Sequence, residues 1–159
     1  MAKGQKGFSL IELLIVVAII LIIAAIAIPN LLRSRMAANE SSAVGSLRTI
    51  NTAEVTFSSS YPTIGFATLT ALGGTAPCTT ATSTSACLID DVLSTTQVKS
   101  GYNFVVGGLT GSPVIVTYTA TGLPSAVGQS GQRGFFTDQS GVIRFTTDGT
   151  APTNASPAI

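Results

Sequence analysis

The sequence of 159 residues contains no histidine and no tryptophan, and only 9% of its residues are charged. Histidine is the commonest general base and the commonest metal ligand in proteins, so its absence argues against most hydrolytic and metal-dependent active sites. No nucleophile–base pair, phosphate-binding glycine loop or pair of catalytic carboxylates can be assembled from the residues that remain. We therefore expect no enzymatic activity, no cofactor and no metal.

Charge of either sign is also scarce. The net charge is +1, and it becomes −1 if the first seven residues are removed, because six basic then face seven acidic side chains. No basic run interleaved with aromatic residues is present. Arg33, Arg35 and Arg48 lie on one predicted helix, where they indicate a solvated or membrane-edge face. The sequence thus predicts no direct nucleic-acid partner.

Cysteine is limited to Cys78 and Cys87, which stand nine residues apart in a segment rich in threonine, serine and alanine. Two sulfurs without a histidine make a zinc site improbable. An oxidising compartment would close them into a disulfide, and two reduced thiols are the alternative. The neighbouring acids Asp90 and Asp91 are not followed by the ligand spacing of an EF-hand calcium loop.

What the sequence does contain is a long apolar run, which extends from Leu13 to Ile28 and ends at Pro29. As a helix this run is about 24 Å long, and counted from Phe8 it is about 31 Å, which matches a bilayer core. A single acid, Glu12, stands at the front of the run. A carboxylate in hydrocarbon costs a few kcal/mol or more, so Glu12 should have a partner.

Three interpretations fit an apolar N-terminal segment. Lys3 and Lys6 with the small-residue site Ala25-Ile26-Ala27 are compatible with a secretory signal peptide. Glu12 at the entrance of the run, and a helical pattern that continues beyond residue 27, argue against it. A plain membrane anchor, in which Glu12 is incidental, is the second interpretation, and the flanking charges leave its orientation open.

The third interpretation uses all of these features. Residues 6–12 read Lys-Gly-Phe-Ser-Leu-Ile-Glu, and the long apolar run follows directly. This arrangement resembles the prepilin signature of type IV pilins and pseudopilins, of the type IVa-like kind. The resemblance covers about residues 1–35 and includes the short basic leader, the glycine, the phenylalanine, the acid at the fifth mature position and Pro29.

The resemblance implies a role for each of these residues. Residues 1–7 would be a leader peptide that a prepilin peptidase cuts after Gly7, and Phe8 would become the new, N-methylated N-terminus. Glu12 would then pair with the N-terminal amine of a neighbouring subunit in the filament, or with the amine of its own Phe8 at i,i+4. The implied partners are further copies of the chain, the peptidase, the pilus assembly platform, minor pilins and the inner membrane. The implied location is the inner membrane, with the C-terminal domain in the periplasm, and then a cell-surface pilus.

The chain divides into five segments: leader 1–7, transmembrane or filament-core helix 8–30, amphipathic helix 31–58, loop region 59–101, and sheet with C-terminal tail 102–159. Proline removes a backbone donor, so we expect a kink or local unwinding at Pro29. The amphipathic helix has a single apolar face, and polar side chains are expected on its other faces. The apolar face holds Val44, Leu47, Ile50, Ala53 and Phe57, and the polar residues are Asn39, Glu40, Ser42, Arg48, Asn51 and Glu54.

Period-two patterns after residue 101 predict strands at 102–106, 114–121, 133–137 and 142–146. A short helical turn is expected at 88–93, a hairpin turn at 138–141, and a loose tail at 151–159. The predicted fold is α+β, with a long N-terminal hydrophobic helix packed on a C-terminal antiparallel sheet of three to four strands.

Three functions compete at this point. A structural pilin polymerised into a surface filament is favoured by the loop that Cys78 and Cys87 can close and by the predicted sheet. A pseudopilin of a type II secretion system shares the N-terminal signature, but the family's C-terminal calcium-site signature is not evident. A membrane-tethered enzyme or binding domain is the remote alternative, and the lack of convergent polar residues argues against it. Major or minor subunit, filament role, helical parameters and glycosylation are not specified by the sequence.

Overall fold

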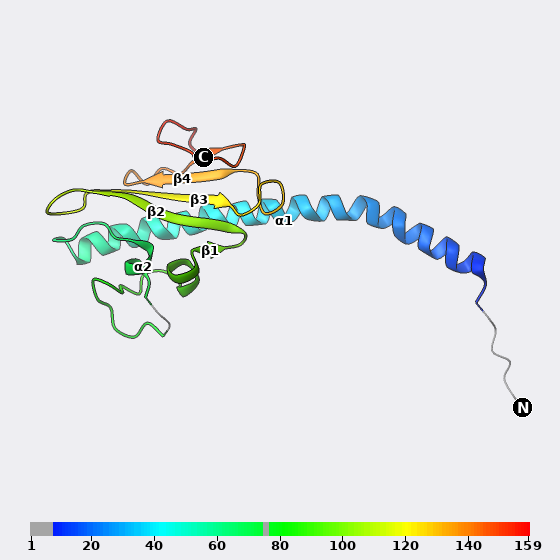
Figure 1. Ribbon diagram of the computed structural model, residues 1–159, viewed down its shortest axis with the longest axis horizontal. Coiled ribbons are helices and arrows are strands. Elements are labelled where there is room, and N and C mark those ends of the chain that lie inside the picture. Colours follow the sequence, from blue (N-terminus) through cyan, green and yellow to red (C-terminus); the bar gives the residue numbers. More distant parts are fainter. Residues whose placement is uncertain (1–7, 75–76) are drawn as a thin grey trace, which may run out of the picture. The chain divides into compact units, whose positions relative to one another are not determined.

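The computed structural model describes residues 8–74 and 77–159 (Figure 1). These residues form two compact units, which divide after Arg35. The helical elements are α1 (Leu10–Ser60), α2 (Leu69–Leu72) and a π-helical turn, η1 (Val92–Thr96). The strands are β1 (Val98–Lys99), β2 (Tyr102–Thr110), β3 (Thr117–Pro124), β4 (Gly134–Asp138) and β5 (Arg144–Thr146). The predicted α+β class, with a long N-terminal helix and an antiparallel sheet, is confirmed.

The N-terminal unit consists of the apolar portion of α1. Leucine, isoleucine and alanine dominate this portion, and no glycine interrupts it between Leu10 and Arg35. Pro29 lies inside α1, and the helix continues through it. The local unwinding that proline allows is therefore absent from this structure, and the kink stays a prediction.

The second unit contains one five-stranded antiparallel sheet in the order β1-β2-β3-β4-β5. Each strand pairs with its neighbour in sequence, so the connections are hairpin-like. Along β3, residues alternate between half-buried and buried positions, as expected for a sheet with one face on a core. The four predicted strands correspond to β2–β5. Sequence patterning does not predict β1, because two residues are too few to show an alternation.

The core of this unit lies between α1 and one face of the sheet. The residues contributed by α1 are Ala43, Leu47, Ile50, Ala53 and Phe57, and those contributed by the strands include Tyr102, Phe104, Tyr118, Ala120 and Phe135. The placement of Glu40 and Glu54 on the solvated faces of this helix is wrong, since their exposed fractions are 8% and 0%. Both acids are buried because other segments of the unit supply hydrogen-bond donors to them.

The region between α1 and the sheet is more ordered than the expected loop. Phe66 N–H donates to Ile115 O (3.1 Å), and Ile115 N–H donates to Ile64 O (2.8 Å). The helical turn expected at 88–93 occurs at 92–96 instead. These contacts attach the segment after α1 to the β2–β3 connection.

The C-terminal residues pack on the edge of the sheet, so the prediction of a loose tail is wrong. Phe145 N–H donates to Pro157 O, and Ile159 N–H donates to Ile143 O, each at 3.0 Å. The expected hairpin turn between β4 and β5 is confirmed, and it is closed by Gly141 N–H donating to Asp138 O (2.9 Å). Gly141 has φ +73°, a conformation that a residue without a Cβ adopts at little cost.

Candidate functional site

The N-terminal end of α1 is formed by Ser9 and Glu12. Ser9 precedes the first helical residue, and its carbonyl accepts the first intrahelical bond, from Leu13 N–H (3.2 Å). The Glu12 carboxylate turns back toward the start of the helix, where its Oε2 accepts the Ser9 N–H at 2.9 Å. This is the glutamate half of a capping box, and the negative charge also lies near the positive end of the helix dipole. The Ser-x-x-Glu spacing is readable in the sequence, but our prediction assigned no role to Ser9.

Phe8 lies two residues before the first helical residue, and 72% of its surface is exposed. The Glu12 carboxylate thus has a partner within its own chain that differs from the expected amine of Phe8. The nitrogen of Phe8 becomes an amine only if the chain is cut before it. The predicted cleavage position, Gly7, lies outside the described residues, so cleavage, methylation and the pairing of Glu12 remain predictions.

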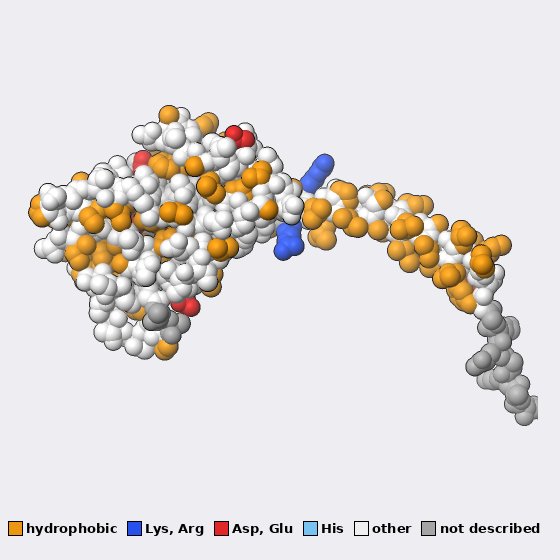
Figure 2. All heavy atoms as spheres, in the orientation of Figure 1, with side chains coloured by type: hydrophobic (Ala, Val, Ile, Leu, Met, Phe, Trp, Pro, Cys, Tyr) orange, Lys and Arg blue, Asp and Glu red, His pale blue; other side chains and the backbone are white. Residues whose placement is uncertain are grey.

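The large apolar side chains in the N-terminal portion of α1, from Leu10 to Leu32, are exposed (Figure 2). An 18-residue window of the helix has a mean hydropathy of 3.3, and none of it is covered by other residues. By length and composition α1 can cross a membrane. Helices that are apolar all round are stable when lipid or protein surrounds them, so this segment requires one or the other.

One stripe of this surface forms a shallow groove. Its residues repeat at intervals of three and four, which places them on a single face of the helix. They are Leu10, Leu13, Leu14, Val17, Ala18 and Leu21. Ala18 is the smallest side chain in the stripe, and small residues allow helices to approach closely in a membrane. The stripe begins beside Glu12, so charge and apolar surface are adjacent at this end of α1.

In the second unit, a buried carboxylate fixes α1 to the segment before β4. Glu40 Oε1 accepts the N–H groups of Gln132 (2.9 Å) and Arg133 (3.1 Å), and its Oε2 accepts Arg133 Nε at 2.8 Å. Burial alone would raise the pKa of Glu40, but these hydrogen bonds and the nearby guanidinium together lower it. The Arg133 guanidinium also lies 5.5 Å and 5.6 Å from the ring centres of Phe135 and Phe145. This contact is structural, since the three hydrogen bonds to the Glu40 carboxylate come from donors of the same unit.

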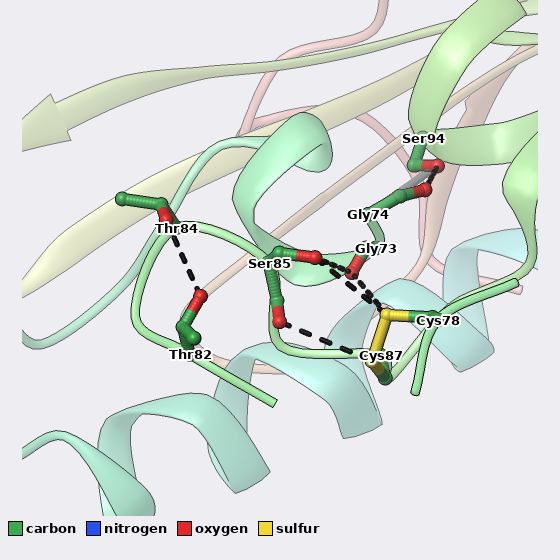
Figure 3. The surroundings of a disulfide bond; sticks show 8 residues. All are labelled: Gly73, Gly74, Cys78, Thr82, Thr84, Ser85, Cys87 and Ser94. Atoms are coloured by element: carbon green, nitrogen blue, oxygen red, sulfur yellow. Dashed lines mark hydrogen bonds between the residues drawn. A yellow bond between two sulfur atoms is a disulfide. The ribbon is translucent and has the colours of Figure 1, made fainter. Parts of the chain in front are cut away.

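The predicted disulfide between Cys78 and Cys87 is present, with a Cα–Cα distance of 5.7 Å (Figure 3). Its loop is anchored at the end of α2, because Cys87 N–H donates to Gly73 O (2.7 Å) and Leu88 N–H donates to Leu72 O (2.8 Å). Between the cysteines the loop is mainly exposed and rich in hydroxyl groups. The disulfide therefore holds a polar surface loop in place.

Comparison with known proteins points to the same N-terminal segment. The family model described as the prokaryotic N-terminal methylation motif matches residues 2–28. The Type IV wide pilus major component PilA4 of Thermus thermophilus is 63% identical over 38 residues, which are 24% of this chain and 29% of that protein. The Type IV major pilin protein PilA of Myxococcus xanthus is 50% identical over 53 residues, which are 33% of this chain and 24% of that protein.

The matched segments span less than a third of the length of either relative, and the search of solved structures gave no significant match. What is shared is the segment that carries Phe8, Glu12 and the apolar portion of α1. The resemblance to the type IV pilin family is thereby confirmed, and the chain carries the N-terminal methylation motif of the prokaryotic pilins.

Proposed function

We propose that the chain is a structural subunit of a type IV pilus, held in the inner membrane by α1 and then polymerised through this helix into a helical surface filament. The observation that supports this proposal most strongly is the uncovered apolar surface of the N-terminal portion of α1, which starts directly at the matched Phe8–Glu12 motif. An apolar surface of this extent is unstable in water. Lipid can cover it before assembly, and further copies of the helix can cover it afterwards.

In this proposal a prepilin peptidase cuts after Gly7, and Phe8 is then methylated. Cleavage creates a positively charged amine at Phe8, four residues before Glu12 in the sequence. In the dry interior of a filament, the amine of a neighbouring subunit and the Glu12 carboxylate would compensate each other's charge. Neither charge could be buried there without the other. Assembly would then depend on processing, because one member of the ion pair does not exist in the uncut chain.

The proposed partners are other copies of the chain, the peptidase, the assembly platform, minor pilins and the inner membrane. The second unit would be exposed in the periplasm and later on the surface of the filament. No catalytic activity is proposed, in keeping with the structural role that the names of both relatives describe. A pseudopilin of a secretion system remains the competing function, and filament yield distinguishes the two.

The test compares Glu12→Ala with Glu12→Gln in the producing cells. Alanine removes both the charge and the acceptor for Ser9 N–H, whereas glutamine retains an acceptor suited to the capping box. Both variants should be cleaved before Phe8, and both should lose most of their sheared filaments if the charge is needed. The readouts are filament yield and the N-terminal residue and mass of the surface protein.

The outcomes separate the possibilities. Normal yield from both variants would contradict the pairing of Glu12 with an amine. Normal yield from Glu12→Gln alone would show that the carboxylate acts as a helix cap. Abundant wild-type filaments that begin with methylated Phe8 support the pilin, whereas their absence together with a secretion defect on deletion supports the pseudopilin.

A further inference from the structure

Two arginines, Arg33 and Arg35, follow the apolar portion of α1 directly, and both are exposed. Within residues 8–74 and 77–159, the ion pairs are Lys99–Asp90 and Arg133–Glu40, so neither arginine has a carboxylate partner there. No acidic residue lies within one helical turn of either arginine in the sequence. This end of the N-terminal unit therefore carries two uncompensated guanidinium groups.

The position of these arginines along the helix matches the thickness of a bilayer. The residues from Leu13 to Leu32 carry no charge. As a helix these residues are about 30 Å long, which is the thickness of the hydrocarbon core. With Glu12 at one membrane surface, Arg33 lies at the other, at the depth of the lipid headgroups.

The directions of the two side chains favour one kind of partner. Residues two apart on an α-helix are separated by about 200° around its axis, so Arg33 and Arg35 point to nearly opposite sides. Figure 2 shows basic side chains on two sides of the helix where its apolar surface ends. A single protein partner would meet one side only. A layer of lipid phosphates surrounds the helix and can meet both.

We propose that Arg33 and Arg35 bind the phosphate groups of anionic phospholipids in the leaflet at the C-terminal end of the span. This inference rests on the proposed membrane insertion of α1. A planar guanidinium binds phosphate oxygens through two parallel hydrogen bonds, and each arginine can engage a separate lipid. The two contacts fix the depth of α1 in the membrane and retain the unassembled subunit there.

The test measures lipid preference of the full-length protein in phosphatidylcholine vesicles that contain phosphatidylglycerol. Spin-labelled forms of each lipid report, by electron paramagnetic resonance, the ratio of their association constants for the protein. The double variant Arg33→Gln/Arg35→Gln is compared with wild type, and Arg48→Gln is the matched control, because Arg48 is an exposed basic residue farther along the same helix. Resistance to carbonate extraction establishes insertion for each protein.

The wild type should prefer phosphatidylglycerol, and the double variant should lose about fivefold of that preference per guanidinium removed. Arg48→Gln should retain it, and added salt should reduce it in the wild type. An equal preference in the inserted wild type and double variant overturns the inference. If that variant also loses filaments, the arginines bind a carboxylate of a second copy instead. Failure of the wild type to insert contradicts the proposed function itself.

Discussion

Replacing Glu54 by glutamine should abolish most of the change in stability that the protein undergoes between about pH 5 and pH 9. The side chain of Glu54 is fully buried in the second unit. Its Oε2 accepts Ala67 N–H at 2.9 Å, and within the described residues its Oε1 has no hydrogen-bond partner. Burial raises the pKa of Glu54 from 4.5 to about 7, although the bond from Ala67 acts in the opposite direction. The pKa of Tyr118 is raised mainly by burial and further by the charge of Glu54.

The sign follows from the direction of this shift. Because the folded protein holds the proton of Glu54 more tightly than the unfolded chain does, stability is greatest below the unfolded pKa and falls as the pH rises through about 7. A shift of this size corresponds to a loss of about 3 kcal/mol in the free energy of unfolding. Glutamine stays neutral at every pH and keeps an acceptor for Ala67 N–H. The variant should therefore be the more stable protein above about pH 8, by an amount of the order of this loss.

The assay is urea unfolding of the full-length protein in detergent at a series of pH values, followed by the fluorescence of its tyrosines. Burial raises the pKa of Tyr102 to about 12, so this probe does not ionise in the range used. The chain has no histidine, and its cysteines form a disulfide, so no side chain with an ordinary pKa titrates near neutrality. The reasoning is refuted if the free energy of unfolding changes with pH in the same way in the wild type and in Glu54→Gln.

Two other side-chain contacts give predictions of their own. Glu40→Gln should lower the free energy of unfolding by about 2–3 kcal/mol at neutral pH, because the hydrogen bond to the half-exposed Arg133 then lacks a negative charge. The difference from wild type should shrink in acid, because Glu40 of the wild type becomes protonated once the pH falls below its lowered pKa. Urea midpoints at about pH 7 and pH 3 check this, and an unchanged difference would contradict it. Cys78→Ser/Cys87→Ser should lower the free energy of unfolding by about 2.5 kcal/mol, because the unfolded chain is no longer restricted by a closed loop of this length. The slope of the unfolding free energy against urea concentration should stay similar. Wild-type protein in a reducing agent should have the same urea midpoint as the variant. If the variant instead has the midpoint of the oxidised wild type, the disulfide contributes nothing to stability.

The helix and the sheet could be predicted because their patterns are long. The apolar run and the repeat of three and four identify α1, and alternation identifies β2–β5. By contrast, β1 and the tail pair through backbone groups, which leave no side-chain pattern in the sequence. The pairing of residues 157–159 with the sheet could be found only from the structure.

The two buried acids show how residue type can hide a correct spacing. Glu40 and Glu54 fall on the same repeat as Ala43, Leu47 and Phe57, and spacing alone places them on the buried face. Their charge suggested a solvated position, since carboxylates are rarely buried without a partner. Their donors, the N–H groups of Ala67, Gln132 and Arg133, come from distant segments that no local pattern connects to α1.

At the candidate site, the sequence predicted the position of Glu12 but not its contact. The family resemblance indicates that Glu12 is half of an intermolecular ion pair, and its spacing from Ser9 also closes a capping box. The two roles use the same carboxylate. A sequence gives the residue but not which of two partners it has in a given state.

The capping contact has a consequence for how a filament could come apart. The Glu12 carboxylate of the single chain already accepts the Ser9 N–H, so the proposed pairing with an amine in a filament would exchange one partner for another. The free-energy gain at this atom is then the difference between two hydrogen-bonded states, which is smaller than the cost of desolvating a bare charge. A subunit that leaves the filament can recover its own cap. If the chain polymerises as proposed, this exchange of partners would favour reversible assembly, and the same helix end could serve repeated cycles of insertion and release.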